Sequence, residues 1–262
     1  MSASVLEREV SLDFAAQGRR LGVPVILLHG LTDSRRSFDR IMARLPASIY
    51  AVAVSLRGHG DSDRPEKGYA PSDFAGDIAA LMDQLELQEA VIVGHSMGAA
   101  VAQRFAIDFP ERTRGLVLAG SFFSLKDHFG VLELWESTVS RLDDPIDPLI
   151  VHNFQLSTIT KSVPAAFLDA VVRESLKVPA RVWKATLRAL IETDFTRELR
   201  NIQAPTMLLW GDQDALVGAG EQDRLLAAIP GSRLNVYTGI GHAPHWEDPA
   251  RFAADIADFA FQ

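Results

Sequence analysis

Short apolar runs rich in Val, Ile, Leu and Ala recur along the chain, separated by longer segments with helical spacing. Runs of this length are typical of strands buried on both faces of a parallel sheet. They predict strands at 25–28, 50–54, 90–93, 115–119, 205–210 and 233–237. Residues 10–14 instead alternate between apolar and polar, a pattern that predicts an exposed edge strand.

Segments with apolar residues three and four positions apart lie between these runs and predict helices. The clearest lie at 37–45, 72–85, 99–106, 221–228 and 249–259. Strands that alternate with helices form a mainly parallel sheet with helices on both faces. The length of 262 residues suits one such α/β domain with room for an insertion.

The pattern changes between residues 122 and 195, where no strand-like run occurs and prolines interrupt the helical periods. The clearest helices there are predicted at 165–176 and 181–191. We expect this stretch to form a helical cap subdomain above the C-terminal edge of the sheet. The core would then comprise residues 1–121 and 196–262, with the cap at 122–195.

Composition narrows the possible partners and the compartment. The formal net charge of −8 argues against nucleic acid or an anionic membrane as the main partner. The chain has no cysteine, which excludes disulfides, a thiol nucleophile and thiolate metal sites. No secretory signal pattern and no run long enough to cross a bilayer is present, so we expect a cytoplasmic protein. The sequence does not determine the oligomeric state.

The segment Gly94-His95-Ser96-Met97-Gly98 has the spacing G-x-S-x-G and joins a predicted strand to a predicted helix. In this context the motif forms a sharp turn that lifts a serine hydroxyl above the end of the sheet. We expect glycine on both sides because the strained turn leaves no room for a Cβ there. Ser96 is therefore a candidate nucleophile.

A serine hydroxyl needs a base to accept its proton, and the base needs a carboxylate to orient it. Histidine suits the first role because it exchanges protons near neutral pH. Asp214 follows a predicted strand, and His242 follows the last one. Both lie in loops at strand ends, where the catalytic groups of such sheets collect.

The chain resembles the α/β-hydrolase superfamily in its short, cap-bearing esterase, lactonase and haloperoxidase branch. The motifs that carry the resemblance are HGLTDS at 29–34, RGHGDSD at 57–63, GHSMGAA at 94–100, WGDQDALV at 210–217 and GHAPHWEDP at 241–249. The resemblance implies Ser96 as nucleophile, His242 as base and Asp214 as acid. It also implies an oxyanion hole formed by the backbone amides of Leu31 and Met97, and no cofactor.

Other residues compete for these roles. Asp212 could be the acid, but we favour Asp214 from the family spacing and expect Asp212 to stabilise its loop. The histidines outside the triad are expected to be structural: His29, His59, His95 and His245. No histidine spacing typical of a metal site occurs, so we expect no catalytic metal.

Aromatic residues are frequent between 122 and 195, and most are expected to hold the helices together. A few should line an apolar pocket over Ser96, and the candidates for substrate binding are Phe122, Trp135 and Trp183. We therefore expect a serine hydrolase that cleaves a small-molecule carboxylic ester or lactone with an apolar moiety.

Two alternatives stay open. The same triad could catalyse perhydrolysis, as in cofactor-free haloperoxidases, or hydrolysis of a carbon–carbon bond, because a fold does not determine a reaction. A protein of a different class, a small-molecule receptor with a retained triad, would turn an ester over once and slowly rather than continuously.

Overall fold

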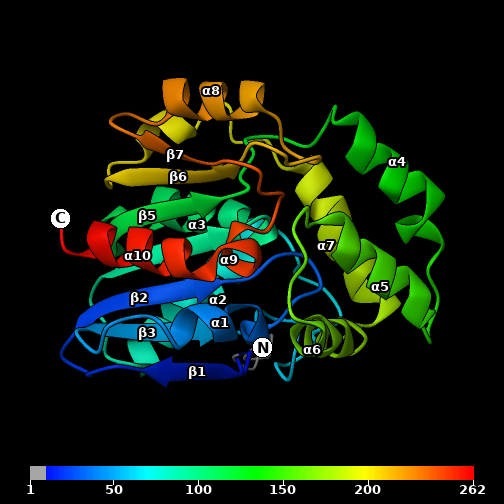
Figure 1. Cartoon of the computed structure of the whole chain (residues 1–262), viewed down its shortest axis with the longest axis horizontal. Helices are drawn as coiled ribbons and strands as arrows, with labels where there is room; N and C mark the ends of the chain where they lie inside the picture. The colour runs from blue at the N-terminus through cyan, green and yellow to red at the C-terminus, as the bar shows by residue number, and fades with distance from the viewer. Residues whose placement is uncertain (1–9) are drawn as a thin grey trace, which may run out of the picture.

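A computed structural model describes residues 10–262. A seven-stranded sheet in the order β1-β3-β2-β4-β5-β6-β7 forms its centre (Figure 1). Among the described residues, β1 alone runs antiparallel to its neighbour, β3. The strands are β1 (Phe14–Gln17), β2 (Val23–Leu28), β3 (Ile49–Val54), β4 (Ala90–His95), β5 (Thr113–Ala119), β6 (Thr206–Gly211) and β7 (Arg233–Tyr237). The predicted α/β architecture is thus confirmed.

The six strands predicted from apolar runs are all present, with ends shifted by at most two residues. The edge strand predicted at 10–14 is wrong in position, because β1 begins at Phe14. Upstream of it, Ser11 and Asp13 exchange backbone hydrogen bonds with the loop at 55–63 and not with a strand. Residues 11–13 are therefore held by a loop, and the sheet ladder starts later.

Helices cover both faces of the sheet, because alternate strand residues point to opposite sides. Helices α2 (Pro71–Gln84), α3 (Met97–Asp108) and α8 (Ala219–Ala228) pack in one apolar cluster. Helices α1 (Asp39–Met42) and α10 (Pro249–Ala260) pack in the cluster on the other face, and the short α9 (Pro244–Glu247) precedes α10. Single 3₁₀ turns are η1 (Arg35–Phe38), η2 (Pro110–Arg112), η3 (Val139–Arg141) and η4 (Leu199–Asn201).

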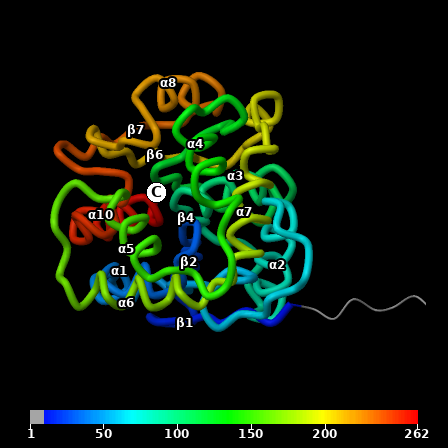
Figure 2. The backbone as a smooth tube through the Cα atoms, turned by 90° about the vertical axis from the view of Figure 1, so that its right-hand side faces the viewer, coloured from blue at the N-terminus to red at the C-terminus, as the bar shows by residue number. Residues whose placement is uncertain are grey.

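Between β5 and β6 the chain forms four α-helices, as the break in the strand pattern predicts. They are α4 (Phe129–Ser137), α5 (Pro148–Ser157), α6 (Ala165–Ser175) and α7 (Ala180–Glu192). They gather at one end of the sheet (Figure 1), and the view from that end shows them in front of the strands (Figure 2). An isolated antiparallel bridge between Ser124 and Asp194 brings the two ends of this helical segment together.

Most apolar residues of the inner strands β2 to β6 are almost completely buried, as expected for a sheet covered on both faces, whereas Phe14 and Val236 of the edge strands are exposed. In residues 10–262, no helix is both long and apolar enough to span a membrane.

Candidate active site

The turn between β4 and α3 holds Ser96 in a backbone conformation that L-residues rarely adopt, with φ 53° and ψ −114°. A Cβ on Gly94 would lie 2.1 Å from the carbonyl oxygen of Gly98, and one on Gly98 would lie 2.2 Å from that of Leu28. Both flanking glycines are thus required by close backbone approach, which confirms the expectation from the motif. The turn is fixed because β4 is a buried inner strand and α3 packs directly on the sheet.

Asp214 and His242 meet at the same end of the sheet, from the loops after β6 and β7. His242 Nδ1 lies 2.8 Å from Asp214 Oδ2, and the other carboxylate oxygen accepts the backbone N–H groups of Leu216 and Val217. Burial opposes ionisation of Asp214, but the His242 imidazole and these amides outweigh it and lower the pKa of the carboxyl. Asp214 can therefore orient the His242 imidazole and stabilise its charged form.

Ser96 and His242 both line one cavity of about 60 Å³. In the described chain, no protein group hydrogen-bonds His242 Nε2, so this nitrogen remains available to a group in the cavity. Hydrogen bonds between nucleophile and base are commonly long before substrate binds. Gly120, with φ 53°, leaves room for the imidazole, because a Cβ there would lie 2.9 Å from His242 Cε1.

The amides expected to form an oxyanion hole flank the serine. Leu31 lies in the turn after β2 and lines the cavity, and Met97 is the first residue of α3. Within residues 10–262, neither N–H donates to another protein group. Two unpaired N–H groups beside a nucleophile, one at a helix N-terminus, can stabilise an oxyanion.

His29 and His59 support the loops near this turn. The N–H of Leu56 donates to His29 Nε2, so Nδ1 carries the ring proton and donates to the Gly30 carbonyl at 2.8 Å. His59 Nδ1 lies 2.8 Å from the Arg57 carbonyl. Burial lowers the pKa of both rings, to about 4 for His59, and holds them neutral.

His95 and His245 pack against each other next to His242, with the His95 ring centroid 4.3 Å from that of His245 and 5.0 Å from that of His242. His95 Nε2 donates to the carbonyl oxygen of His242 at 2.9 Å, and His245 Nε2 lies 3.0 Å from Ser37 Oγ. Burial lowers the pKa of both, to about 3 for His95. These contacts agree with the structural roles expected from the sequence.

Asp212 turns away from His242. Its Oδ1 accepts the backbone N–H of Gly239 at 2.7 Å, so it joins the loops after β6 and β7. This is the loop-stabilising position that we expected for the rival carboxylate.

Of the three aromatic candidates for substrate binding, Phe122 alone lies in the cavity wall. Trp183 is 1% exposed and packs edge-on against Phe154, with ring centroids 5.2 Å apart. Trp135 packs on the outside of the same apolar cluster. The positions of the two tryptophans therefore do not support the prediction that they line the pocket.

The rest of the cavity wall is aliphatic apart from Phe154, and our sequence reasoning did not identify it. These residues are Leu125, Val131, Leu134, Phe154, Leu187, Leu190, Leu216 and Val217. They come from three helices and two loops, and apolar residues of buried helices look alike in sequence. Only the helical spacing of Leu187 and Leu190 offered a signal for a shared face.

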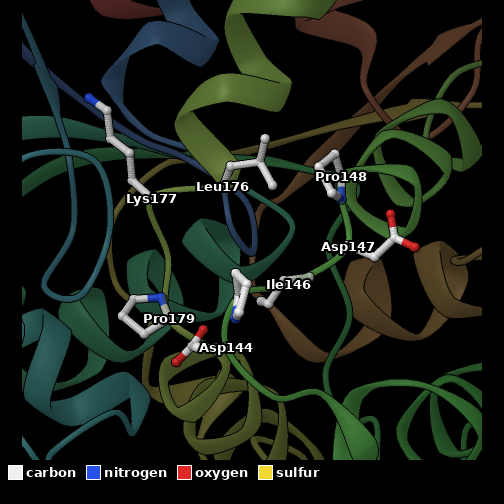
Figure 3. Close-up of a pocket in the computed structure, with 8 residues that line it drawn as sticks. Asp144, Ile146, Asp147, Pro148, Leu176, Lys177 and Pro179 are labelled. Carbon is white, nitrogen blue, oxygen red and sulfur yellow. The ribbon is translucent and has the colours of Figure 1, made fainter.

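A larger, open groove of about 720 Å³ lies between the segment before α5 and the end of α6 (Figure 3). Its charged groups are engaged by the fold: Asp144 and Asp147 accept backbone N–H groups, and Lys177 pairs with Asp61 and Glu174. Its lining includes neither Ser96 nor His242, so it is separate from the cavity. Nowhere in residues 10–262 do three or more His, Asp or Glu side chains gather as a metal site would require.

Comparison with known proteins identifies the family. The model of the alpha/beta hydrolase family matches residues 25–255, most of the chain. The chain belongs to the alpha/beta hydrolase family. The sheet order and the sharp turn at Ser96 agree with this membership, which places the chain in a family of hydrolases.

Individual members of the family resemble the chain over nearly its whole length. It is 40% identical to 2-(acetamidomethylene)succinate hydrolase of Mesorhizobium japonicum, over 91% of this chain and 88% of that protein. It is 30% identical to a 2-hydroxy-6-oxononadienedioate/2-hydroxy-6-oxononatrienedioate hydrolase of Pseudomonas putida, over 96% and 93% of the two chains. Among solved structures, an esterase from a Rhodococcus species superposes with a TM-score of 0.85 at 28% identity, covering 97% and 95%.

Proposed function

We propose that this alpha/beta hydrolase is a serine hydrolase that cleaves a carboxylic ester or lactone with an apolar moiety. The observation that carries the proposal is the shared cavity: Ser96 and His242 line one apolar space, and His242 is paired with Asp214. Three of the four helices inserted between β5 and β6 (α4, α5 and α7) supply much of the wall of this space, and we propose that residues 122–195 act as a cap subdomain.

In this mechanism Ser96 Oγ attacks the substrate carbonyl while His242 Nε2 takes its proton. Asp214 holds the imidazole through Nδ1 and stabilises the imidazolium that forms. The N–H groups of Leu31 and Met97 donate to the oxygen that becomes negative. His242 then protonates the leaving alcohol, and a water activated by the same histidine releases the acid from Ser96.

The chemistry of the cavity wall favours a neutral, small substrate group. Among the described residues, Ser96 and His242 are the only polar side chains that line it, and no Lys or Arg does. The relative at 40% identity is named for a succinate, which carries two carboxylates. A carboxylate moved into this apolar space would lose its hydration without gaining a cationic partner. We therefore propose an uncharged acyl group of a few carbons.

Carbon–carbon bond hydrolysis is the second candidate, and similarity to the hydrolase of Pseudomonas putida favours it. That relative is named for a dioate, so the absence of cations from this cavity wall argues against the same substrate here. Perhydrolysis would use the same nucleophile and oxyanion hole with peroxide in place of water.

Hydrolysis of p-nitrophenyl acetate, butyrate and hexanoate, a γ-lactone and a ring-fission dienedioate by the purified protein tests the proposal. We expect steady turnover of the short esters or the lactone, and a fall of several orders of magnitude in kcat for Ser96→Ala. Asp212→Asn is a control for the effect of substitution near the cavity, because the Asp212 side chain lies outside the proposed triad. Turnover of the dienedioate without ester turnover would replace the proposal by the second candidate, and a single slow turnover would favour a receptor.

A further inference from the structure

The turn that carries Leu31 is strained at its second central residue. Gly30 to Asp33 form a turn closed by a hydrogen bond from the Asp33 N–H to the Gly30 carbonyl at 3.2 Å. Thr32, the second central residue, has φ 70°. This conformation is commonly reserved for glycine or asparagine in such turns, and it is disfavoured for a β-branched residue. A strained residue persists only where its surroundings hold it.

The side chain of Thr32 is held by two helices of the segment between β5 and β6. Gln155 of α5 places Nε2 3.1 Å from Thr32 Oγ1, and Thr32 Oγ1 donates to Ser175 Oγ of α6 at 3.3 Å. Ser175 in turn donates to the Val171 carbonyl, so each hydroxyl proton in the chain has an acceptor. All three side chains are at most 1% exposed.

The Gln155 amide also contacts Asp33, the next residue of the turn. Gln155 Nε2 lies 3.0 Å from Asp33 Oδ1 and 2.7 Å from Ser175 Oγ. Asp33 is buried, and Ser37 Oγ donates to its other oxygen at 3.3 Å. Burial raises the pKa of Asp33 to about 7, although the bonds from Gln155 and Ser37 oppose the rise. One buried glutamine thus contacts both residues that follow Leu31.

We propose that Gln155 is a positioning residue that holds the strained turn and thereby aims the Leu31 N–H at the reacting carbonyl. The inference rests on the proposed function for its catalytic consequence, but the contacts themselves are independent of the substrate. The two N–H groups of Gln155 Nε2 are shared among Asp33, Thr32 and Ser175, so one amide joins the turn to α6 from a helix more than 120 residues away in the chain. The helical segment would then contribute to transition-state stabilisation as well as to the cavity wall.

The test replaces Gln155 by methionine, which has similar length and cannot donate. We expect kcat for p-nitrophenyl acetate to fall roughly ten- to a hundredfold with KM changed less than threefold, part of the loss that removing one oxyanion donor causes. Gln222→Met is the matched control, because Gln222 is equally buried but donates to the Ser121 carbonyl. We expect that variant to fall less than threefold in kcat.

A double-mutant cycle separates positioning from general loss of packing. Glycine adopts positive φ without strain, so in a Thr32→Gly background the turn no longer depends on Gln155 for its shape. We expect Gln155→Met to lower kcat less than threefold in that background. An equal loss in both backgrounds would overturn the proposal. If Gln155→Met does not fold, Ser175→Ala replaces it in the same cycle, with an expected three- to tenfold loss.

Hydrogen exchange provides a readout that needs no substrate. We expect Gln155→Met to speed amide exchange at least tenfold in the peptide covering 30–37, whereas Gln222→Met leaves that peptide unchanged. Faster exchange in a protein that hydrolyses neither the esters nor the lactone would refute the proposed function and leave the positioning role standing. Unchanged exchange, or an unchanged kcat in an active esterase, would refute the positioning role.

Discussion

Two turns of the candidate active site hold a non-glycine residue at positive φ, and they are supported in different ways. Ser96, with φ 53°, sits between an inner strand and a helix, and its N–H bonds the Ala119 carbonyl of the adjacent strand at 2.9 Å. Thr32, with φ 70°, is gripped by side chains of α5 and α6, which belong to the inserted helices.

The difference separates two kinds of support. At Ser96 the turn is fixed by backbone contacts with the sheet and by the close approach at two glycines. A substitution that alters this turn therefore has to move the backbone of the core. At Thr32 the support comes from polar side chains, which a single substitution can remove while the sheet stays intact. We therefore expect the nucleophile to be robust to changes in the inserted helices and the oxyanion turn to be sensitive to them.

The largest expected effect concerns the loop after β6 that carries Asp214. Backbone N–H groups of the same loop, those of Leu216 and Val217, hold this carboxylate in place. We expect Asp214→Asn to lower kcat roughly 10³- to 10⁴-fold, because the amide favours the wrong imidazole tautomer and no longer stabilises its charge. Asp212→Asn should cost less than tenfold, since the amide oxygen still accepts the Gly239 N–H. Steady-state kinetics on a short ester measure both, and similar losses would reopen the assignment of the acid.

Gly98→Ala attacks the support of the serine turn directly. The new Cβ would lie 2.2 Å from the Leu28 carbonyl oxygen, so the backbone of β2 must move. We expect a loss of more than about 3 kcal/mol in the free energy of unfolding, measured by urea denaturation. Gly220→Ala in α8 is the control: nothing lies within 4 Å of its Cβ position, and it should stabilise by about 0.5 kcal/mol or more. A mild effect of Gly98→Ala would mean that this turn is adaptable after all.

The pH dependence of stability reports on buried titratable groups near both turns. Four buried histidines have lowered pKa values: His29, His59, His95 and His245. Between about pH 6.5 and 4 these rings bind protons in the unfolded chain but stay neutral in the folded one. The free energy of unfolding therefore decreases as the pH is lowered. Asp33 acts in the opposite sense, because its folded pKa of about 7 exceeds its unfolded value of 3.8.

Because the four rings resist protonation and outnumber Asp33, unfolding near pH 5 takes up protons, and we expect stability to fall as the pH is lowered. Asp33→Asn removes the opposing proton, so we expect its stability to fall more steeply, by about 1.4 kcal/mol per unit. Urea denaturation at pH 7, 6 and 5 measures both slopes. Parallel slopes in the two proteins would show that Asp33 is ionised when folded.

The smallest expected effect concerns substrate size. Phe154 of α5 lines the cavity, and its replacement by alanine opens space beside Ser96. We expect Phe154→Ala to raise kcat/KM for p-nitrophenyl hexanoate relative to acetate about tenfold, the range that a few methylene contacts provide. Leu149→Ala on the same helix is the control, because Leu149 is exposed. An unchanged ratio would place the acyl group elsewhere.

Much of this molecule is determined by its sequence, because the relevant signals are local. Continuous apolar runs predicted six of the seven strands, and G-x-S-x-G between a strand and a helix predicted the strained serine turn. In both cases the signal lies within a few residues: a short run of apolar side chains, or a glycine such as Gly94 whose Cβ would meet the carbonyl oxygen of Gly98. Family motifs singled out Asp214 and His242, which the structure brings to a 2.8 Å hydrogen bond.

The tertiary structure alone decided what depends on distant segments meeting. The cavity wall is made of ordinary leucines, valines and phenylalanines whose shared face appears only when helices and loops converge. The start of β1 depended on which residues hydrogen-bond to the loop at 55–63, and of the two tryptophans Trp183 is buried whereas Trp135 packs on the outside of the apolar cluster. In the sequence, Gln155 is one of several polar residues of its helix, beside His152 and Asn153. The proposed role of Gln155 follows only from the tertiary structure, in which its amide contacts the strained Thr32. The strain and the contacts that support it arise between segments far apart in the sequence, so the order of residues does not reveal them.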